Sequence, residues 1–286
     1  MKNLSAALWV LEKKVLKNKD LSQDPIRYVH QYTNPQDQEL IGWIAAHLSY
    51  GRVAGIQRAI EGVLKPLGNN PSDKALGASN GYWVTEYRAS IDDWKWRFHK
   101  PDDMMYWIKA WVKIHNSGGL EKRLMPTKKL NAEDQLGLLI ENLRKELPMT
   151  YGLRFNLPNP AEGSAAKRWR MMMRWFVRSG WPDLGIWKEY PAADLVIPVD
   201  VHIARITRYL GIHNQKEINN SLAVCITEAL KTVDRRDPLR FDYPLAHMGI
   251  EGNCPLNLNR EICTICPLYE VCLRPKGSPH KRTENA

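Results

Sequence analysis

Apolar residues recur along this chain at steps of three and four, and this spacing constrains its fold more than any other feature. In the stretch IGWIAAHL, for example, Ile41, Ile44 and Leu48 fall on one side of a helix. Similar patterns occupy residues 101–115, 131–147, 167–180, 201–211 and 221–233. Ser221 is the expected N-cap of the last of these helices. Because no stretch shows the alternation of β-branched and polar residues that is typical of strands, we predict an all-α protein of roughly eight to eleven helices.

Four cysteines lie close together near the C-terminus, in the stretch CPLNLNREICTICPLYEVC. They are Cys254, Cys263, Cys266 and Cys272. Thiolates bind soft metal ions, and a Cys-x-x-Cys pair directs two of them at one ion. Zinc sites commonly use two such pairs, whereas this stretch has one pair flanked by single cysteines. The spacing therefore favours a [4Fe–4S] cluster, with zinc as the alternative.

The expected compartment and the net charge of the chain indicate which class of protein it belongs to. The opening stretch MKNLSAALWVLEKKVLKNKD lacks a signal-peptide pattern, and no stretch approaches the roughly 18 apolar residues of a membrane span. We therefore expect a cytoplasmic protein without membrane contact, in which disulfides are disfavoured. The sequence contains 41 Lys and Arg against 31 Asp and Glu, a formal net charge of +10. This excess favours a polyanionic partner, above all DNA, and hence nucleoid association.

The residues around the cysteines carry a family resemblance. YPLAHMGIEGNC and the following Cys-x2-Cys-x5-Cys run resemble the cluster loop of the endonuclease III branch of the helix-hairpin-helix DNA glycosylases. His247 and Gly249 stand where that family has a His-Gly segment. The first cysteine gap is eight residues here and six in the family, which lengthens the loop but removes no ligand. The resemblance implies a loop that presents basic residues to DNA phosphate, here Arg260, Arg274 and Lys276.

Two further stretches resemble the same glycosylases. In IPVDVHIARI, Asp200 directly precedes a helical pattern, where an N-cap carboxylate is favoured in its ionised form. This stretch resembles the segment that holds the family's catalytic aspartate. In LPNPAEGSAAKRW, the pattern from Gly163 to Lys167 resembles the Gly-x-x-x-Lys segment of the 8-oxoguanine-removing enzymes. The separation of 33 positions from Lys167 to Asp200 is similar to that in archaeal 8-oxoguanine DNA glycosylases.

The resemblance implies a two-lobed helix-hairpin-helix glycosylase fold. Residues 30–210 would form a lobe with the hairpin, Lys167 and Asp200. Residues 1–29 and 211–275 would form the second lobe, with the iron–sulfur loop at 254–272, followed by a disordered tail at 276–286. The pattern over residues 35 to 275 also resembles a widespread bacterial family of unknown function, DUF2400.

The implied activity is that of a base-excision DNA repair enzyme, a DNA glycosylase with AP lyase activity. It would act as a monomer on double-stranded DNA and remove an oxidised base, 8-oxoguanine in the first place. Asp200 would stabilise positive charge on the sugar, and Lys167 would attack C1′ to form a Schiff base, with Lys188 as the reserve nucleophile. Oxidised pyrimidines are the alternative substrates. The alternative functions are a non-catalytic iron–sulfur DNA-binding protein and an iron–sulfur electron carrier.

Such enzymes extrude the damaged base into a pocket of aromatic and apolar side chains. The aromatic candidates are Tyr50, Phe98, Trp169, Trp181 and Trp187. Ser49 and Arg52, in the stretch AAHLSYGRV, are further candidates for contact with base or DNA, as is His202. The backbone N–H groups of Gly163, Ser164 and Ala165 are candidates for a phosphate, because the N-terminus of a helix binds anions.

Overall fold

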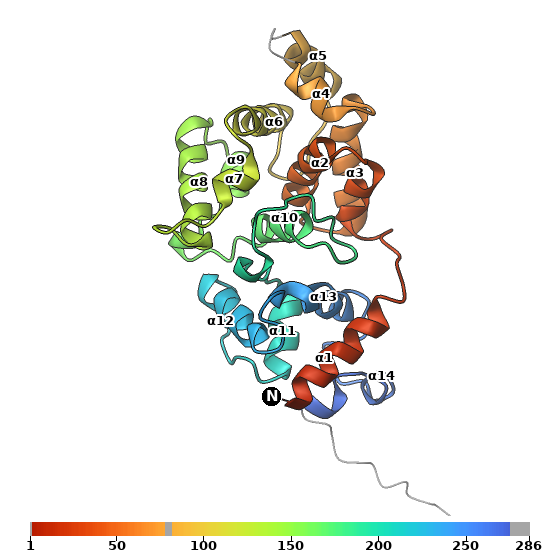
Figure 1. Cartoon of the computed structure of the whole chain (residues 1–286). Helices are drawn as coiled ribbons and strands as arrows, with labels where there is room; N and C mark the ends of the chain where they lie inside the picture. The colour runs from red at the N-terminus through yellow and green to blue at the C-terminus, as the bar shows by residue number, and fades with distance from the viewer. Residues whose placement is uncertain (1, 78–81, 275–286) are drawn as a thin grey trace, which may run out of the picture.

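The chain folds into helices joined by loops, as the computed structural model shows for residues 2–77 and 82–274 (Figure 1). Over these ranges no β-strand occurs, and one isolated bridge joins Trp96 and His99. The predicted all-α class is therefore confirmed. The predicted disordered tail at 276–286 lies outside the described residues, as does Lys276. Within the described ranges, no helix combines the length and apolar character that a membrane crossing requires.

The elements run as follows along the chain. The first part contains α1 (Lys2–Val15), η1 (Pro25–Gln31), α2 (Pro35–Leu48), α3 (Val53–Leu64), η2 (Lys65–Leu67), α4 (Pro71–Leu76), α5 (Tyr82–Ser90), α6 (Pro101–Asn116), α7 (Leu120–Leu124) and α8 (Ala132–Glu146). The second part contains α9 (Tyr151–Asn156), η4 (Pro160–Glu162), α10 (Lys167–Val177), η5 (Ala192–Asp194), α11 (Val201–Tyr209), α12 (Asn220–Lys231), η6 (Pro238–Phe241), α13 (Asp242–Ile250), α14 (Arg260–Thr264) and η7 (Tyr269–Val271).

The sequence underestimated the number of helices in the described ranges. The additional helices are short: α4, α7, α9 and α14 have only five or six residues each. Segments of this length present too few apolar residues to show a helical period. The start of α12 also differs from the prediction, because the N-cap is Asn219, whose side chain accepts a hydrogen bond from the backbone N–H of Leu222. Ser221 lies inside this helix.

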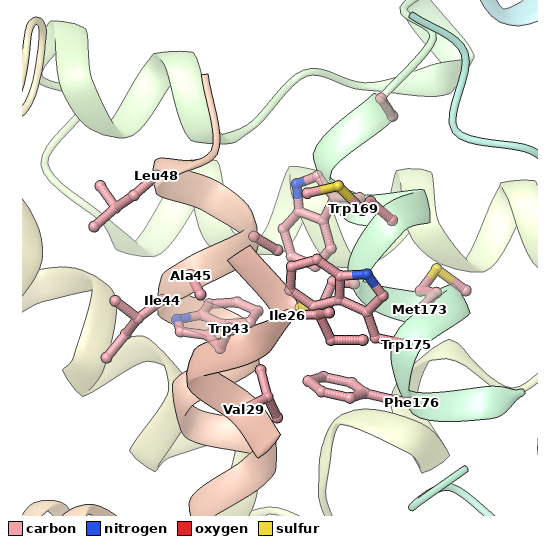
Figure 2. Packing of buried hydrophobic residues seen from close by; sticks show 14 of the residues in the cluster. Ile26, Val29, Trp43, Ile44, Ala45, Leu48, Trp169, Met173, Trp175 and Phe176 are labelled. Carbon is pink, nitrogen blue, oxygen red and sulfur yellow. The ribbon is translucent and has the colours of Figure 1, made fainter. Parts of the chain in front are cut away.

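The apolar core is centred on the crossing of α2 and α10 (Figure 2). Trp43 of α2 and Trp169 of α10 are both fully buried, and their ring centroids lie 5.3 Å apart. Close approach of the two helices depends on Gly42, because a Cβ atom there would lie 2.4 Å from Cζ of Phe176. The two helices thus fix each other's position through aromatic rings and one missing side chain.

The N-terminal helix α1 packs against elements from the C-terminal part of the chain. In Figure 1, α1 lies beside α13 and α14, in the part of the molecule that also holds α11 and α12. Nζ of Lys14 donates to the carbonyl of Ile265 at 3.5 Å, and Trp9 meets Phe241 edge-on at 5.3 Å. Helix α11 packs mainly against α13, although the predicted first lobe extended to residue 210. The predicted domain boundaries stay a prediction.

Helix α10 carries a series of buried arginines with carboxylate partners. Nε of Arg174 lies 3.1 Å from the carboxylate of Asp183, and its Nη1 pairs with Asp242. Arg178 also pairs with Asp183, and its Nε lies 2.7 Å from Asp237. The side chain of Asp183 is fully buried between the two guanidinium groups. The carboxylate partners offset the cost of removing these guanidinium groups from water.

We expect Asp183→Asn to lower the free energy of unfolding by about 3–5 kcal/mol, because two buried guanidinium groups lose a shared carboxylate. Urea unfolding followed by circular dichroism measures this change. The control is Asp92→Asn, which removes a carboxylate that pairs with Arg88 but is 71% exposed. We expect that substitution to cost less than about 1 kcal/mol. Equal losses in the two variants would contradict a structural role for the buried network.

Candidate functional site

Asp200 is held at the N-terminus of α11. Its backbone is extended, with φ −122°, and its Oδ1 accepts hydrogen bonds from the backbone N–H groups of His202 and Ile203 at 2.9 and 3.0 Å. The apolar residue before it, Val199, is buried and anchors the chain at the point where the helix begins. Because capping uses only Oδ1, the second carboxylate oxygen stays available for another partner.

Lys167 supplies that partner. It is the first residue of α10, and the preceding Ala166 has a left-handed backbone with φ 41°. Nζ of Lys167 lies 3.7 Å from Oδ2 of Asp200, and the two side chains are 35% and 22% exposed. The structure thus brings together two residues that lie 33 positions apart in the sequence and that the family resemblance singled out. Their partial exposure leaves both accessible to a bound molecule.

Two cavities meet at this pair. The larger has a volume of about 660 Å³, and the smaller has a volume of about 320 Å³. Lys167 and Ser49 line both cavities, whereas Asp200 lines only the smaller. Ser49 ends α2 and donates its hydroxyl hydrogen to the carbonyl of Ala45 at 2.6 Å. The ion pair therefore stands where a ligand in either cavity reaches it.

The smaller cavity has polar side chains set in apolar walls. Asp24, His202, Tyr243 and His247 line it. The ring of His247 stacks at 3.9 Å on Tyr243, and its Nε2 lies 3.5 Å from Oδ2 of Asp24. His202 packs directly on α13, since a Cβ atom on Gly249 would lie 2.5 Å from Nδ1 of His202.

Electrostatic contacts set the protonation of these groups. Burial by itself would lower the pKa of His247, but the neighbouring carboxylates of Asp24 and Glu251 outweigh it and raise the pKa. Burial raises the pKa of Asp242 to about 6, although the guanidinium of Arg174 opposes this shift. The smaller cavity therefore combines an imidazole that favours its protonated form with carboxylates.

The larger cavity is aromatic and cationic. Tyr50, Tyr151, Arg154 and Phe155 line it together with Lys167. The ring centroids of Tyr50 and Phe155 lie 4.6 Å apart. Tyr151 is 67% exposed, so a large aromatic side chain stands at the rim.

Tyr50 is held by a buried hydrogen-bond chain. Its hydroxyl lies 2.7 Å from Nδ1 of His99, and Nε2 of His99 lies 3.0 Å from Oδ1 of Asn156. Burial, reinforced by the charge of Arg168, lowers the pKa of His99 to about 4. The ring is therefore neutral at pH 7, with its proton on Nε2, and Nδ1 accepts the hydrogen bond from Tyr50.

Arg168 differs from the other buried arginines of α10, because it has no carboxylate partner among the described residues. Its guanidinium donates to the carbonyl of His47 at 3.0 Å and to the carbonyl of Phe155. These carbonyls belong to the last turns of α2 and α9, where the helix dipole favours a cation. Burial nevertheless lowers the pKa of Arg168 to about 10. The residue fixes the C-terminal ends of both helices beside the larger cavity.

Several predicted contacts lie elsewhere, and the tryptophans are the clearest correction. Trp169 is 0% exposed and donates its indole N–H to the carbonyl of Asn156 at 2.8 Å. Trp187 donates to Glu39 at 2.7 Å and lines a separate cavity, and Trp181 packs against His30. Among the five aromatic candidates, Tyr50 lines a cavity beside the ion pair, and Phe98 stacks behind it at 6.1 Å. Trp169 and Trp187 are packing residues whose indole N–H groups have partners within the protein, and Trp181 packs against the ring of His30.

The amide groups expected to bind phosphate are also engaged. The backbone N–H of Gly163 donates to the carbonyl of Pro160 at 2.9 Å, and that of Ser164 donates to Asn159 at 3.2 Å. Both are used to close the turn that precedes α10, so the predicted phosphate contact is corrected for these two residues. The side chain of Ser164 still lines the larger cavity. Lys188, the reserve nucleophile, donates to the carbonyl of Gly185 at 2.6 Å and lines neither cavity.

The arginines predicted to contact DNA lie in different parts of the structure. Arg52 is exposed at the start of α3 and lines neither cavity, and Arg260 is exposed on α14. Arg274 donates to the carbonyls of Pro255 and Leu256, so its guanidinium braces the cysteine loop. Its predicted contact with DNA is therefore not supported by its orientation.

The four cysteines of the loop line one apolar cavity of about 40 Å³, whose walls include Ile206, Leu210 and Leu268. Within the described ranges, no three His, Cys, Asp or Glu side chains converge closely enough to hold a metal ion as they stand. Burial raises the pKa of Cys254 and of Cys266. A soft cation would have to displace these thiol protons to bind. Cys225 lies apart from the loop on α12 and is half-buried.

Sequence reasoning missed the polar residues that face Lys167 across the smaller cavity. Asp24 precedes η1 and caps it, with Oδ1 accepting from the N–H of Ile26 at 3.0 Å. In the sequence, an Asp directly before a Pro indicates only a helix cap, so Asp24 carried no functional signal. Its partner His247 was recognised only as part of a family segment. Since the two lie 223 positions apart in the sequence, no local pattern links them.

Comparisons with known proteins give one match. Residues 24–251 match the model of a family described as a protein of unknown function, DUF2400. The matched segment begins at Asp24, includes Lys167 and Asp200, and ends before Cys254. No curated protein and no solved structure matches the chain.

The buried His99 predicts acid sensitivity. Its ring stays neutral in the folded protein down to about pH 4, whereas an unfolded histidine takes up a proton below about pH 6.5. The unfolded state therefore binds more protons over this window, and stability falls as pH falls, by about 3 kcal/mol from this residue. Urea unfolding between pH 7.5 and pH 4 measures the loss. We expect a smaller acid-induced loss in His99→Gln, and an equal loss in both proteins would exclude this cause.

Proposed function

The chain belongs to the DUF2400 family, whose function is unknown, and we propose that it is a DNA glycosylase with AP lyase activity that removes an oxidised base from DNA. The observation that carries the proposal is the contact between Lys167 and Asp200 at the meeting point of two cavities. A primary amine and a carboxylate side by side are the two groups that this chemistry requires.

Asp200 would act on the sugar. Cleavage of the N-glycosidic bond leaves positive charge on the sugar ring, and a fixed carboxylate next to C1′ stabilises that charge. Capping of α11 holds Asp200 in one orientation, with Oδ1 engaged and Oδ2 directed at Lys167. No reorganisation is then needed as the charge develops. The departing base takes the electron pair of the broken bond and a proton.

Lys167 would act as the nucleophile. Its neutral amine attacks C1′, loses a proton, and forms a Schiff base as the sugar ring opens at O4′. Loss of a C2′ proton then expels the 3′ phosphate, which cleaves the strand by β-elimination. Because Lys167 is the first residue of α10, its amine stays at the cavity surface, while the rest of the helix is buried.

The fold proposed for this activity is the helix-hairpin-helix glycosylase fold. Helices α9 and α10 are joined by residues 157–166, which contain the short η4 turn. This connection lies beside the larger cavity through Pro158 and Ser164. DNA is the proposed partner, in keeping with the +10 charge and with exposed Arg52 and Arg260 as phosphate contacts.

The four loop cysteines are proposed to hold a [4Fe–4S] cluster, with zinc as the alternative. Four thiols around one apolar cavity suit a soft metal centre. A bound cluster would cross-link the loop between α13 and the end of the described chain. No step of base removal passes through it.

The catalytic assignment is tested by trapping with borohydride, which reduces a Schiff base to a stable protein–DNA adduct. We expect the native chain to be trapped on duplexes that contain an oxidised base or an abasic site. Lys167→Gln should abolish trapping, and Asp200→Asn should slow base release by about 100-fold or more. Lys188→Gln is the matched control and should be trapped as efficiently as the native chain, because this lysine lines neither cavity.

Full trapping of Lys167→Gln would exclude this lysine as the nucleophile. Salt-sensitive DNA binding without base release on any lesion would instead favour the non-catalytic DNA-binding alternative. A series of duplexes with oxidised purines and pyrimidines, each assayed with and without borohydride, distinguishes these results.

The metal assignment is tested on the purified protein. We expect broad visible absorption that bleaches on reduction, with iron and acid-labile sulfide in equal amounts. Cys263→Ser should lose most of the metal, whereas Cys225→Ser should keep it, because Cys225 lies on α12 away from the loop. Zinc without sulfide would establish the alternative metal.

A further inference from the structure

The larger cavity lies beside the reacting pair, but the chemistry proposed for that pair does not use it. A sugar that reacts must reach both Lys167 and Asp200, and both residues line the smaller cavity, whereas Asp200 does not line the larger one. The reacting nucleotide is therefore assigned to the smaller cavity. The larger cavity, with its volume of about 660 Å³, adjoins it through Lys167 and Ser49 and is left for another ligand.

The charged side chains that line the larger cavity are all cationic. They are Arg154, Lys167 and Arg168, and no carboxylate lines this cavity within the described part of the chain. Arg154 is exposed on α9 and makes no ion pair or side-chain hydrogen bond with another described residue. A guanidinium group without a carboxylate partner at the wall of a cavity is available to an anionic ligand, and phosphate suits its geometry.

An exposed aromatic ring stands next to this cation. Tyr151 precedes Arg154 by three residues on α9, so both side chains lie on one side of the helix, and both line the larger cavity. Tyr151 is 67% exposed, and its ring meets that of Phe98 edge-on, with the centroids 4.9 Å apart. An exposed ring at the edge of a cavity offers a surface on which a planar group stacks.

Packed rings hold Tyr151 in place. The ring centroids of Phe98 and Phe155 lie 5.0 Å apart, and those of Tyr50 and Phe155 lie 4.6 Å apart. Cζ of Arg168 lies 4.0 Å from the ring centroid of Phe155, which is a cation–π contact. Because its neighbours are fixed, Tyr151 loses little conformational freedom when a ligand stacks on it.

A further cation borders the same rings. Arg97 lies at the tip of a tight turn in which Trp96 and His99 exchange backbone hydrogen bonds of 3.1 and 2.8 Å. Its backbone is left-handed, with φ 50°, which is uncommon for a residue other than glycine. Its Cζ lies 5.6 Å from the ring centroids of both Tyr50 and Phe98. The turn thus places an exposed guanidinium group beside the aromatic cluster.

We propose that the larger cavity binds a second nucleotide of the DNA strand, unpaired and unstacked, with its base on Tyr151 and its phosphate at Arg154. Stacking on an aromatic ring is tolerant of sequence, because every base has a π-face. The inference rests on the proposed function, since it takes DNA as the partner, and it deepens that function. The preferred substrate then has an unpaired nucleotide next to the damaged one.

The test measures binding to DNA without any lesion, so that it does not depend on catalysis. The full-length protein is titrated into two fluorescently labelled duplexes, one fully paired and one with an internal bulge of unpaired thymidines, and fluorescence anisotropy gives the dissociation constants. We expect the bulged duplex to bind about 5- to 100-fold more tightly, as stacking of one base provides. Equal affinity for the two duplexes would overturn the inference.

Tyr151→Ala tests the position of the site. The preference for the bulged duplex should fall by about 5-fold or more, whereas Tyr151→Phe, which keeps the ring, should retain it. Tyr106→Ala is the matched control, because Tyr106 is a half-buried tyrosine on α6 that lines neither cavity. Its preference should equal that of the native chain. A preference that survives in full in Tyr151→Ala would overturn the assignment to the larger cavity.

Arg154→Gln tests the phosphate contact. The slope of log affinity for the bulged duplex against log salt concentration should become shallower by about one in this variant. Lys145→Gln is the control, since Lys145 is an exposed cation on α8 that lines neither cavity, and its slope should equal that of the native chain. An unchanged slope in Arg154→Gln would overturn the phosphate contact.

Two further comparisons separate the source of the nucleotide and the two proposals. A short oligothymidine should compete with the bulged duplex far better than thymidine monophosphate at equal nucleotide concentration, and equal competition would overturn the DNA strand as the source. The bulge preference without borohydride trapping on any lesion would overturn the glycosylase proposal and support the second nucleotide site. Trapping without the bulge preference would overturn the second site alone.

Discussion

Compensation of buried positive charge along α10 is the constraint on which the arrangement of the molecule depends. Arg170 pairs with Glu133 and also donates to Asn220 at 2.6 Å, which ties α8 and α12 to the helix. Arg174 and Arg178 recruit carboxylates from the segment after α10 and from the start of α13. Each of these contacts brings a distant part of the chain to one helix. The charge of α10 thus organises the structure as much as its apolar face does.

The same helix explains why the candidate site lies where it does. Arg168 uses the carbonyl ends of α2 and α9 as its partners, which aligns both helices at the larger cavity. Lys167 precedes it at the helix start, outside the buried network, and meets Asp200 from the start of α11. Two helix N-termini therefore face each other across the site. The rigidity needed to hold two reactive groups comes from charges buried behind them.

Local features of this structure, such as helices and their caps, could be predicted from the sequence, whereas contacts between distant segments could not. Helix α8 is encoded locally, because Asn131 and Asp134 form a capping box at its N-terminus. The cap of α12 was misassigned because both Ser221 and Asn219 are good caps. A long-range contact decides between them, since the N–H of Asn220 donates to the carbonyl of Gly163 on another segment.

The position of Trp169 in the core also depends on contacts with other segments, and no pattern in its own helix indicates it. Lys167 and Asp200 were predictable from flanking residues, whereas the facing of Asp24 and His247 appears only once the chain is folded.

The packing of α1 has a consequence for the order in which the molecule assembles. Lys14 and Ile265, which meet across this contact, are separated by 251 positions in the chain. Since domains fold largely as they emerge during synthesis, residues from α2 to α10 can form their core while α1 still has no surface to cover. Helix α1 must wait until the cysteine loop has been made, and closing so long a loop is slow. The face of α1 that packs on α13 and η7 therefore stays uncovered until residues 242–271 have been synthesised.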